Sequence, residues 1–314
     1  MNNQQLRKTK KTVIIIGYNC NNRCQFCIDE DKRSYIAKTT KDIEKEMIEA
    51  RKRGTTYLEI IGGEFTIRPD AIPLVSFAKQ LGFKTIAMAT NGRMYSYLNY
   101  TQKMVKAGLT DIVFSIHGHN EKLHDSLTQS PGSFRQLLKG LANFKKLVFK
   151  NIGSNTTIVK SNYKFLLQIG QFIYDQGIRN SEFIFVDPSS GGAKTNFSKL
   201  VPKISDIAPY VRECLDIAKK HKTSHWTIRY VPLCYFQDYL NQISELLEVK
   251  RFHTEHLAPD FKNYDVENSR KEIGRIKTKK CGKCRLFNEC EGIWREYFKN
   301  YGDEELKPIV NPHT

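Results

Sequence analysis

A regular alternation of short apolar segments with longer amphipathic ones is the feature that most constrains the fold. Apolar segments read as strands at 13–16, 57–61, 84–89, 111–116, 152–159 and 181–186. Segments with helical spacing follow at 42–53, 71–81, 96–107, 133–147, 163–176 and 204–220. This pattern predicts βαβ units around a parallel sheet. Six units are too few for a closed eight-stranded barrel.

The pattern changes after residue 220. A strand is expected at 226–231, a helix at 238–247 and another at 294–301, while 250–280 is polar and supports no assignment. We therefore expect a core domain over 1–224 and a smaller domain over 225–314.

The cysteines indicate metal or redox chemistry. The chain has eight, and its longest aliphatic run near the N-terminus, 13–16, is too short for a signal peptide or a membrane span. We therefore expect a cytoplasmic protein with no membrane partner. In that compartment cysteines rarely form disulfides.

Three cysteines follow the first strand directly, in the spacing C-x3-C-x2-C. They are Cys20, Cys24 and Cys27, with Phe26 before the last. Three thiolates can ligate three irons of a [4Fe–4S] cluster and leave the fourth open to a non-protein ligand. Zinc sites favour paired C-x2-C units and a fourth ligand, which this loop does not supply.

Polar and glycine motifs follow three later strands. These are Gly62-Gly63-Glu64, Thr90-Asn91-Gly92 and Ser115-Ile116-His117-Gly118. Function in parallel α/β folds lies at the carboxyl ends of strands. Glycine allows close approach to a ligand, and a glutamate can accept a hydrogen bond from an ammonium group.

Together these motifs resemble those of the radical S-adenosylmethionine (SAM) superfamily, over the first two thirds of the chain. The resemblance implies a partial (β/α)6 barrel. It also implies that the open iron chelates SAM and that reductive cleavage of SAM yields a 5′-deoxyadenosyl radical, which abstracts hydrogen from a substrate. The expected cofactors are thus a SAM-binding [4Fe–4S] cluster and SAM.

The resemblance also assigns roles to individual residues. Phe26 is the aromatic residue of the cluster motif, and Gly62, Gly63 and Glu64 bind the SAM amino group, with Arg68-Pro69-Asp70 as the usual continuation. Asn91, Ser115 and Asn155 are placed to reach the ribose or the carboxylate. His117 stands where many relatives carry an acidic residue.

A second cysteine set lies near the C-terminus, in Cys281-x2-Cys284-x5-Cys290 with Cys234 upstream. Four thiolates can hold either a [4Fe–4S] cluster or a structural zinc. The spacing resembles part of the SPASM and twitch extensions of radical SAM enzymes, which favours a twitch-like domain with one auxiliary [4Fe–4S] cluster. Cys214 falls in a helical pattern and is expected to be a buried apolar residue.

A histidine-rich segment could be taken for a metal site. It holds His117, His119, His124 and Asp125. We expect a structural role instead, with His124 and Asp125 capping a helix or bonding to the loop.

The net charge of +17 can indicate nucleic acid, an anionic membrane or an acidic partner, or can serve solubility alone. Residues 270–285 hold eight basic residues against one acid. An acidic flavodoxin or ferredoxin would supply the electrons that a cluster enzyme needs. An alternative from another class, a zinc-stabilised nucleic-acid-binding protein, explains the charge but leaves Gly62-Gly63-Glu64 and the six βα units without a role.

The substrate stays open between a peptide and a small molecule such as a sugar or nucleotide, so the reaction is that of an oxidoreductase or modifying enzyme. About a dozen residues precede the first strand, too few for a leader-peptide-binding domain. A peptide substrate would then need a stand-alone partner for its leader. We favour a peptide slightly.

Overall fold

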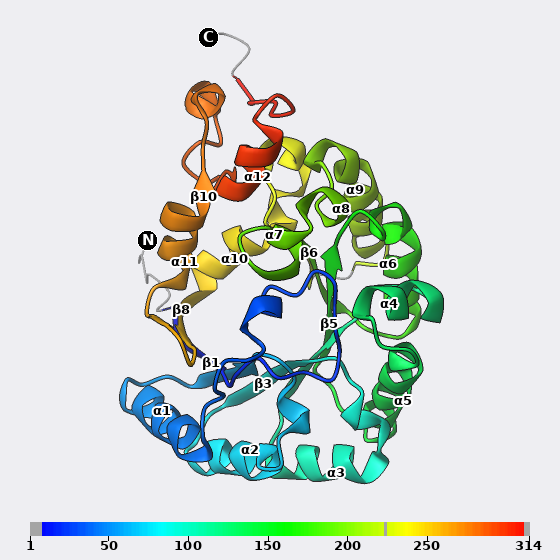
Figure 1. The fold of residues 1–314 in the computed structure, drawn as a ribbon, viewed down its shortest axis with the longest axis vertical. Helices are drawn as coiled ribbons and strands as arrows, with labels where there is room; N and C mark the ends of the chain where they lie inside the picture. Colours follow the sequence, from blue (N-terminus) through cyan, green and yellow to red (C-terminus); the bar gives the residue numbers. More distant parts are fainter. Residues whose placement is uncertain (1–7, 223–224, 311–314) are drawn as a thin grey trace.

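The computed structural model describes residues 8–222 and 225–310 and contains one large sheet with helices around its outer face (Figure 1). The nine strands lie in the order β7-β6-β5-β4-β3-β2-β1-β8-β9, and only β8 and β9 pair antiparallel. The strands are β1 (Thr9–Ile15), β2 (Tyr57–Ile61), β3 (Thr85–Thr90), β4 (Asp111–Ser115), β5 (Ile152–Ile158), β6 (Asn180–Phe185), β7 (His225–Arg229), β8 (Phe252–Leu257) and β9 (Lys262–Asn263).

The structure has the helices that the alternation predicts and further short helices at 121–128, 191–195, 197–200 and 266–269 that were not predicted. They are α1 (Thr40–Lys52), α2 (Ala71–Gln80), α3 (Leu98–Ala107), α4 (Glu121–Thr128), α5 (Ser133–Lys146), α6 (Leu166–Asp175), α7 (Gly191–Thr195), α8 (Phe197–Leu200), α9 (Ile204–Lys220), α10 (Ser244–Arg251), α11 (Val266–Ser269) and α12 (Arg295–Tyr301). A small second sheet pairs β10 (Arg275–Ile276) with β11 (Ile293–Trp294).

The predicted parallel α/β fold is confirmed, and the sheet is larger than the six strands expected. β7 continues it beyond β6, and β8 lies beside β1 at the other side. Both strands follow residue 224, where the sequence suggested a domain boundary. The core sheet therefore extends across that position.

Two assignments after residue 230 were wrong or missing. The helix expected at 238–247 is divided in two. Gln237–Gln242 forms a 3-10 helix and α10 begins only at Ser244, because Ile243 between them is extended and bridges Ile228 of β7. β8 was not recognised because it buries polar residues. Its Glu255 accepts hydrogen bonds from Thr12 at 2.6 Å and from Arg53 at 2.6 Å.

The two faces of the sheet differ in polarity. Leu58, Ile60 and Phe114 are fully buried against the outer helices. The opposite face surrounds an inner cavity of about 280 Å³. Its charged and amide lining includes Lys11, Glu59, Asn155, Glu182, Arg229, Glu248 and Arg251. Barrel interiors are usually filled by apolar side chains, so polar inward positions leave this one open.

α10 lies between the two ends of the sheet. It contacts both β7 and β8, which do not pair with each other (Figure 1). A helix here takes the place of strand pairing. Among the described residues, no helix combines the length and apolar character needed to cross a membrane.

Asp125 near the end of α4 fixes the start of α5. Its carboxylate accepts hydrogen bonds from the backbone N–H of Phe134 at 2.8 Å, from the Ser133 hydroxyl at 2.8 Å and from the N–H of Gly132 at 2.5 Å. The first N–H groups of a helix have no partner within the helix. The structural role expected for Asp125 is thus confirmed.

We expect Asp125→Ala to lower the free energy of unfolding by about 1–2 kcal/mol, because the start of α5 loses its acceptor. Urea denaturation of the two proteins measures the difference. Asp175→Ala, which removes an exposed carboxylate bonded only to the Gln171 side chain, serves as the matched control. Equal losses in the two variants would contradict the capping role.

Candidate functional site

The loop with Cys20, Cys24 and Cys27 leaves β1 at the carboxyl edge of the sheet. Backbone bonds attach it to α4, from Gln25 N–H to Leu127 at 3.1 Å, and to α7, from Gly192 N–H to the Cys27 carbonyl at 2.9 Å. Figure 1 shows this dark blue loop beside α7. The loop is therefore held by elements that follow β4 and β6.

The three thiols are suited to bind a cation. Burial raises the pKa of each thiol, that of Cys24 to about 12, so without a cation the thiols stay protonated at neutral pH. A bound cation would instead favour the thiolate form. The Asn22 N–H lies 3.3 Å from the Cys20 sulfur, and the Asn91 amide nitrogen lies 3.8 Å from it. Hydrogen bonds to sulfur are among the interactions that tune iron–sulfur clusters. The donor set therefore fits a cluster.

Gly62 and Gly63 bring the end of β2 against the cysteine loop. Both have positive φ, 93° and 49°. A Cβ on Gly63 would lie 2.1 Å from the Asn19 carbonyl oxygen, and one on Gly62 would lie 2.6 Å from Ile15. The glycine motif predicted a close approach to a ligand. In the structure, the close approach of these glycines is to the cysteine loop and the end of β1.

Glu64 is buried, with 1% of its surface exposed. Its carboxylate accepts bonds from the hydroxyls of Thr66 at 2.6 Å and Thr90 at 2.9 Å, and from the Asn91 N–H at 2.7 Å. Burial raises the pKa of Glu64, although these bonds oppose the rise. Glu64 thus joins the end of β2 to the end of β3.

The other predicted SAM contacts lie on or after neighbouring strands and in the cysteine loop. Asn91 also donates to the Asn21 side chain at 2.6 Å, within the cysteine loop. Ser115 and Asn155 are register partners on β4 and β5, and Asn155 lines the inner cavity. Phe26 packs edge-to-face on His117 with ring centroids 4.7 Å apart. Their contacts with SAM stay predictions.

His117 and His124 are core histidines. Their rings stack at 5.9 Å, and each Nδ1 accepts a backbone N–H, from Thr157 and from His117. Burial lowers the pKa of His117 to about 3 and that of His124 to about 4. His119 instead contacts Asn120 and Phe165.

Sequence reasoning missed the residues that brace the cysteine loop from β6. A Cβ on Gly192 would lie 2.0 Å from the Gln25 carbonyl oxygen, and one on Gly191 would lie 2.2 Å from that of Cys27. The signal was the Gly191-Gly192 pair after a strand. Arg93 was also missed, and its guanidinium bonds to Asn21 and Asn22.

The second cysteine set lines one pocket. Cys234, Cys281, Cys284 and Cys290 share it with apolar residues such as Leu286, Phe287 and Ile293. The N–H groups of Leu233 and Gly292 lie 3.5 and 3.3 Å from the Cys290 sulfur. Burial raises the pKa of Cys234 to about 11. Cys214 is buried elsewhere, against Gly170, as predicted.

The spread of the C-terminal sulfurs is compatible with an auxiliary cluster. Within the described ranges, no three of these sulfur atoms lie within 4.8 Å of one another. Tetrahedral zinc with bonds of about 2.3 Å would hold its sulfurs about 3.8 Å apart. A [4Fe–4S] cluster places each thiolate on a different iron and so farther apart. The arrangement fits a cluster better.

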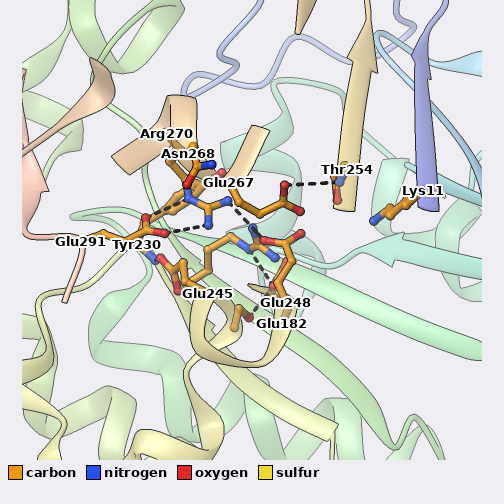
Figure 2. A network of polar contacts seen from close by, with 12 residues as sticks. Lys11, Glu182, Tyr230, Glu245, Glu248, Thr254, Glu267, Asn268, Arg270 and Glu291 are labelled. Atoms are coloured by element: carbon orange, nitrogen blue, oxygen red, sulfur yellow. Dashed lines mark hydrogen bonds and ion pairs between the residues drawn. The ribbon is translucent and has the colours of Figure 1, made fainter. Parts of the chain in front are cut away.

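A chain of ion pairs runs from the inner cavity to Glu291, the neighbour of Cys290 in the sequence, and Figure 2 shows its members Glu182, Glu248, Arg270 and Glu291. Arg229 contacts Glu182 at 2.8 Å and Glu248 at 3.0 Å. Arg270 contacts Glu248 at 3.2 Å and Glu291, beside Cys290, at 2.8 Å. Burial opposes ionisation, but Arg229 and Arg270 lower the pKa of Glu248 to about 2.

Known proteins resemble the chain in sequence and in fold. Residues 14–164 match the radical SAM superfamily. A relative from Saccharolobus islandicus, named probable GTP 3′,8-cyclase, is 26% identical over 220 residues, 69% of each chain. AdoMet-dependent heme synthase from Methanosarcina barkeri is 27% identical over 179 residues, 56% of this chain and 50% of that protein.

Solved structures resemble almost the whole chain. Streptococcus suis SuiB bound to S-adenosylmethionine has a TM-score of 0.67 at 17% identity, over 97% of this chain and 77% of its own. AnSMEcpe with bound AdoMet and the Cp18Cys peptide has a TM-score of 0.65 at 13% identity, over 96% of this chain and 93% of its own.

A parallel α/β sheet with a three-cysteine loop at its carboxyl edge defines a class of iron–sulfur enzymes. With the match over residues 14–164, the chain contains a radical SAM domain, the domain of the radical SAM superfamily of enzymes. The family uses a [4Fe–4S] cluster and SAM as cofactors.

We expect the free energy of unfolding to fall between pH 7.5 and 5.5. Folded His117 and His124, with pKa values of about 3 and 4, stay neutral, while unfolded imidazoles take up protons near pH 6.5. The unfolded state then binds more protons, which costs about 1–1.5 kcal/mol of stability per histidine.

Urea denaturation of iron-loaded protein under argon at both pH values measures this loss. His124→Asn keeps a side-chain acceptor but removes one titrating group, so its loss should be smaller by about 1 kcal/mol. An equal loss in both proteins would show that His124 does not titrate on unfolding.

Proposed function

We propose that the chain uses SAM to abstract a hydrogen atom from a peptide. In this proposal Cys20, Cys24 and Cys27 hold the SAM-binding cluster, and the four C-terminal cysteines hold an auxiliary [4Fe–4S] cluster. When bound and reduced, the first cluster would supply the electron that cleaves the S–C5′ bond of SAM to give methionine and a 5′-deoxyadenosyl radical. Asn91, Ser115, Asn155 and the Gly62-Gly63-Glu64 turn would orient SAM beside it.

The inner cavity carries the proposal for the substrate. Its lining holds Lys11, Arg229 and Arg251 against Glu59, Glu182 and Glu248. Lys11 pairs with Glu59, and Arg229 pairs with both other glutamates. A triphosphate needs several unpaired cations, and of these three cations only Arg251, which is exposed, is in no ion pair among the described residues. A peptide side chain, by contrast, needs only a polar cavity that is large enough to admit it.

The cavity adjoins a larger one of about 630 Å³ at the amino ends of the strands. Both include Glu59, Asn180 and Arg251 in their lining. A polymer can reach inward through such an opening while most of it stays outside. SuiB has been solved with its precursor peptide SuiA, and anSMEcpe with Cp18Cys, which supports a peptide here as well.

A nucleotide is the second candidate, because several relatives are named GTP 3′,8-cyclases. The outer cavity favours it, since Lys145, Lys150 and Arg179 add positive charge there. The two substrates are separated by the substrate test below.

We also propose an acidic flavodoxin or ferredoxin as the reductant. The basic segment 270–285 surrounds the C-terminal cysteines, where Lys280 contacts Asp303 at 3.5 Å and Lys271 donates to the Asn288 carbonyl at 3.4 Å. A positive surface near a cluster would speed the encounter with an acidic protein.

Iron content tests the cofactor assignment. Reconstituted protein should hold about eight irons per chain, since each cluster has four. Alanine at Cys20, Cys24 and Cys27 should leave about four irons and abolish SAM cleavage. Alanine at Cys214, a buried cysteine outside both sets, is the control and should leave eight. One zinc in place of four irons would disprove the auxiliary cluster.

Mass spectrometry tests the substrate. Iron-loaded enzyme, SAM and dithionite are incubated either with a library of synthetic peptides or with GTP. We expect a change in mass of a peptide, dependent on SAM, together with 5′-deoxyadenosine. A product from GTP instead would replace the peptide by the nucleotide and leave the cofactor assignment intact.

A further inference from the structure

Three metal-ligating side chains meet outside the site described above. His253 lies in β8, Asp265 precedes α11 and Glu267 lies in it. One ligand atom from each lies within 4.8 Å of the other two, and no other such group occurs in 8–222 and 225–310. An imidazole and two carboxylates thus converge from two elements.

Glu267 provides an independent sign of a missing ligand. It is 8% exposed, and its Oε2 accepts the Thr254 N–H at 3.3 Å (Figure 2). Its Oε1 is buried with no hydrogen-bond partner. Buried carboxylate oxygens are normally paired, so this atom lacks a partner that a cation would supply.

We propose that His253, Asp265 and Glu267 bind a divalent transition metal, with Zn²⁺ as the reference ion. Imidazole nitrogen and carboxylate oxygen are common ligands of zinc, whereas Ca²⁺ and Mg²⁺ prefer oxygen alone. The Asp265 carboxylate also accepts two hydrogen bonds from Asn268, one from the Asn268 backbone N–H at 3.4 Å and one from the Asn268 side-chain amide at 2.6 Å. These bonds leave lone pairs free and orient the carboxylate.

The metal would brace the connection between the sheet and the C-terminal region. It fastens α11 to β8, three residues before Arg270, which contacts Glu248 and Glu291 (Figure 2). Three protein ligands leave one position of a tetrahedral ion for water. Metal binding should therefore stabilise the folded protein.

Metal uptake by the iron-loaded enzyme tests the site. Protein with both clusters reconstituted is dialysed under argon against Zn²⁺, desalted and analysed for zinc and iron by mass spectrometry. The variants are Glu267→Gln, which is isosteric and keeps an acceptor for Thr254, and His253→Ala, which truncates an exposed side chain. His221→Ala and Glu304→Gln remove an exposed histidine and an exposed acid elsewhere.

We expect one zinc per chain in the wild type and both controls, at least tenfold weaker binding in Glu267→Gln and His253→Ala, and equal iron in all. Zinc should also raise the Tm of the wild type and leave that of Glu267→Gln unchanged. Equal zinc in all five proteins, or none in any, would overturn the proposal. Since iron is measured separately, failure of the cluster assignment would be seen independently.

Discussion

The close contact of the cysteine loop with the strand ends is the constraint on which the site depends. Thiolates without a cation are costly in a buried position. Contacts other than those of the sulfurs must therefore fix the loop that is to hold a cluster. Gly63 and Gly192 remove the side chains that would separate the loop from β2 and α7. The buried carboxylate of Glu64 then joins the ends of β2 and β3 beneath it. Backbone geometry therefore sets the position of the three sulfurs.

The inner face of the sheet follows a different rule from the outer face. Leu58, Ile60 and Phe114 fill the space under the helices, and burial of such side chains stabilises the fold. Lys11, Glu59 and Arg229 occupy inward positions and pair with one another or with acids on α10. The interior between these side chains keeps a cavity of about 280 Å³. The outer face of the strands thus contributes to stability through apolar packing, and the inner face of the same strands lines the cavity proposed for the substrate.

The sequence sufficed for the parts of the molecule in which local pattern and tertiary role agree. Six strands, their helices and the glycine and polar motifs at strand ends followed from periodicity and spacing, and Asp125 was correctly read as structural. β8 could not be read, because its buried Thr254 and Glu255 are polar and give it no apolar period. Glu255 is instead satisfied by distant partners, Thr12 and Arg53. Gly191-Gly192 was overlooked for a related reason. A glycine pair signals a tight approach but does not say which segment approaches.

The ion pairs between β7 and the C-terminal region are better explained by specificity than by stability. Charges lose hydration on burial, and an apolar substitute of the same size is often as stable. Arg229, Glu248 and Arg270 nevertheless form a continuous chain from the inner cavity to Glu291. An apolar contact would tolerate many positions of η7 (Arg270–Gly274), whereas bidentate pairing of Arg270 with Glu291 requires one. Since Glu291 adjoins Cys290, the same bonds that border the cavity also orient the second cysteine set.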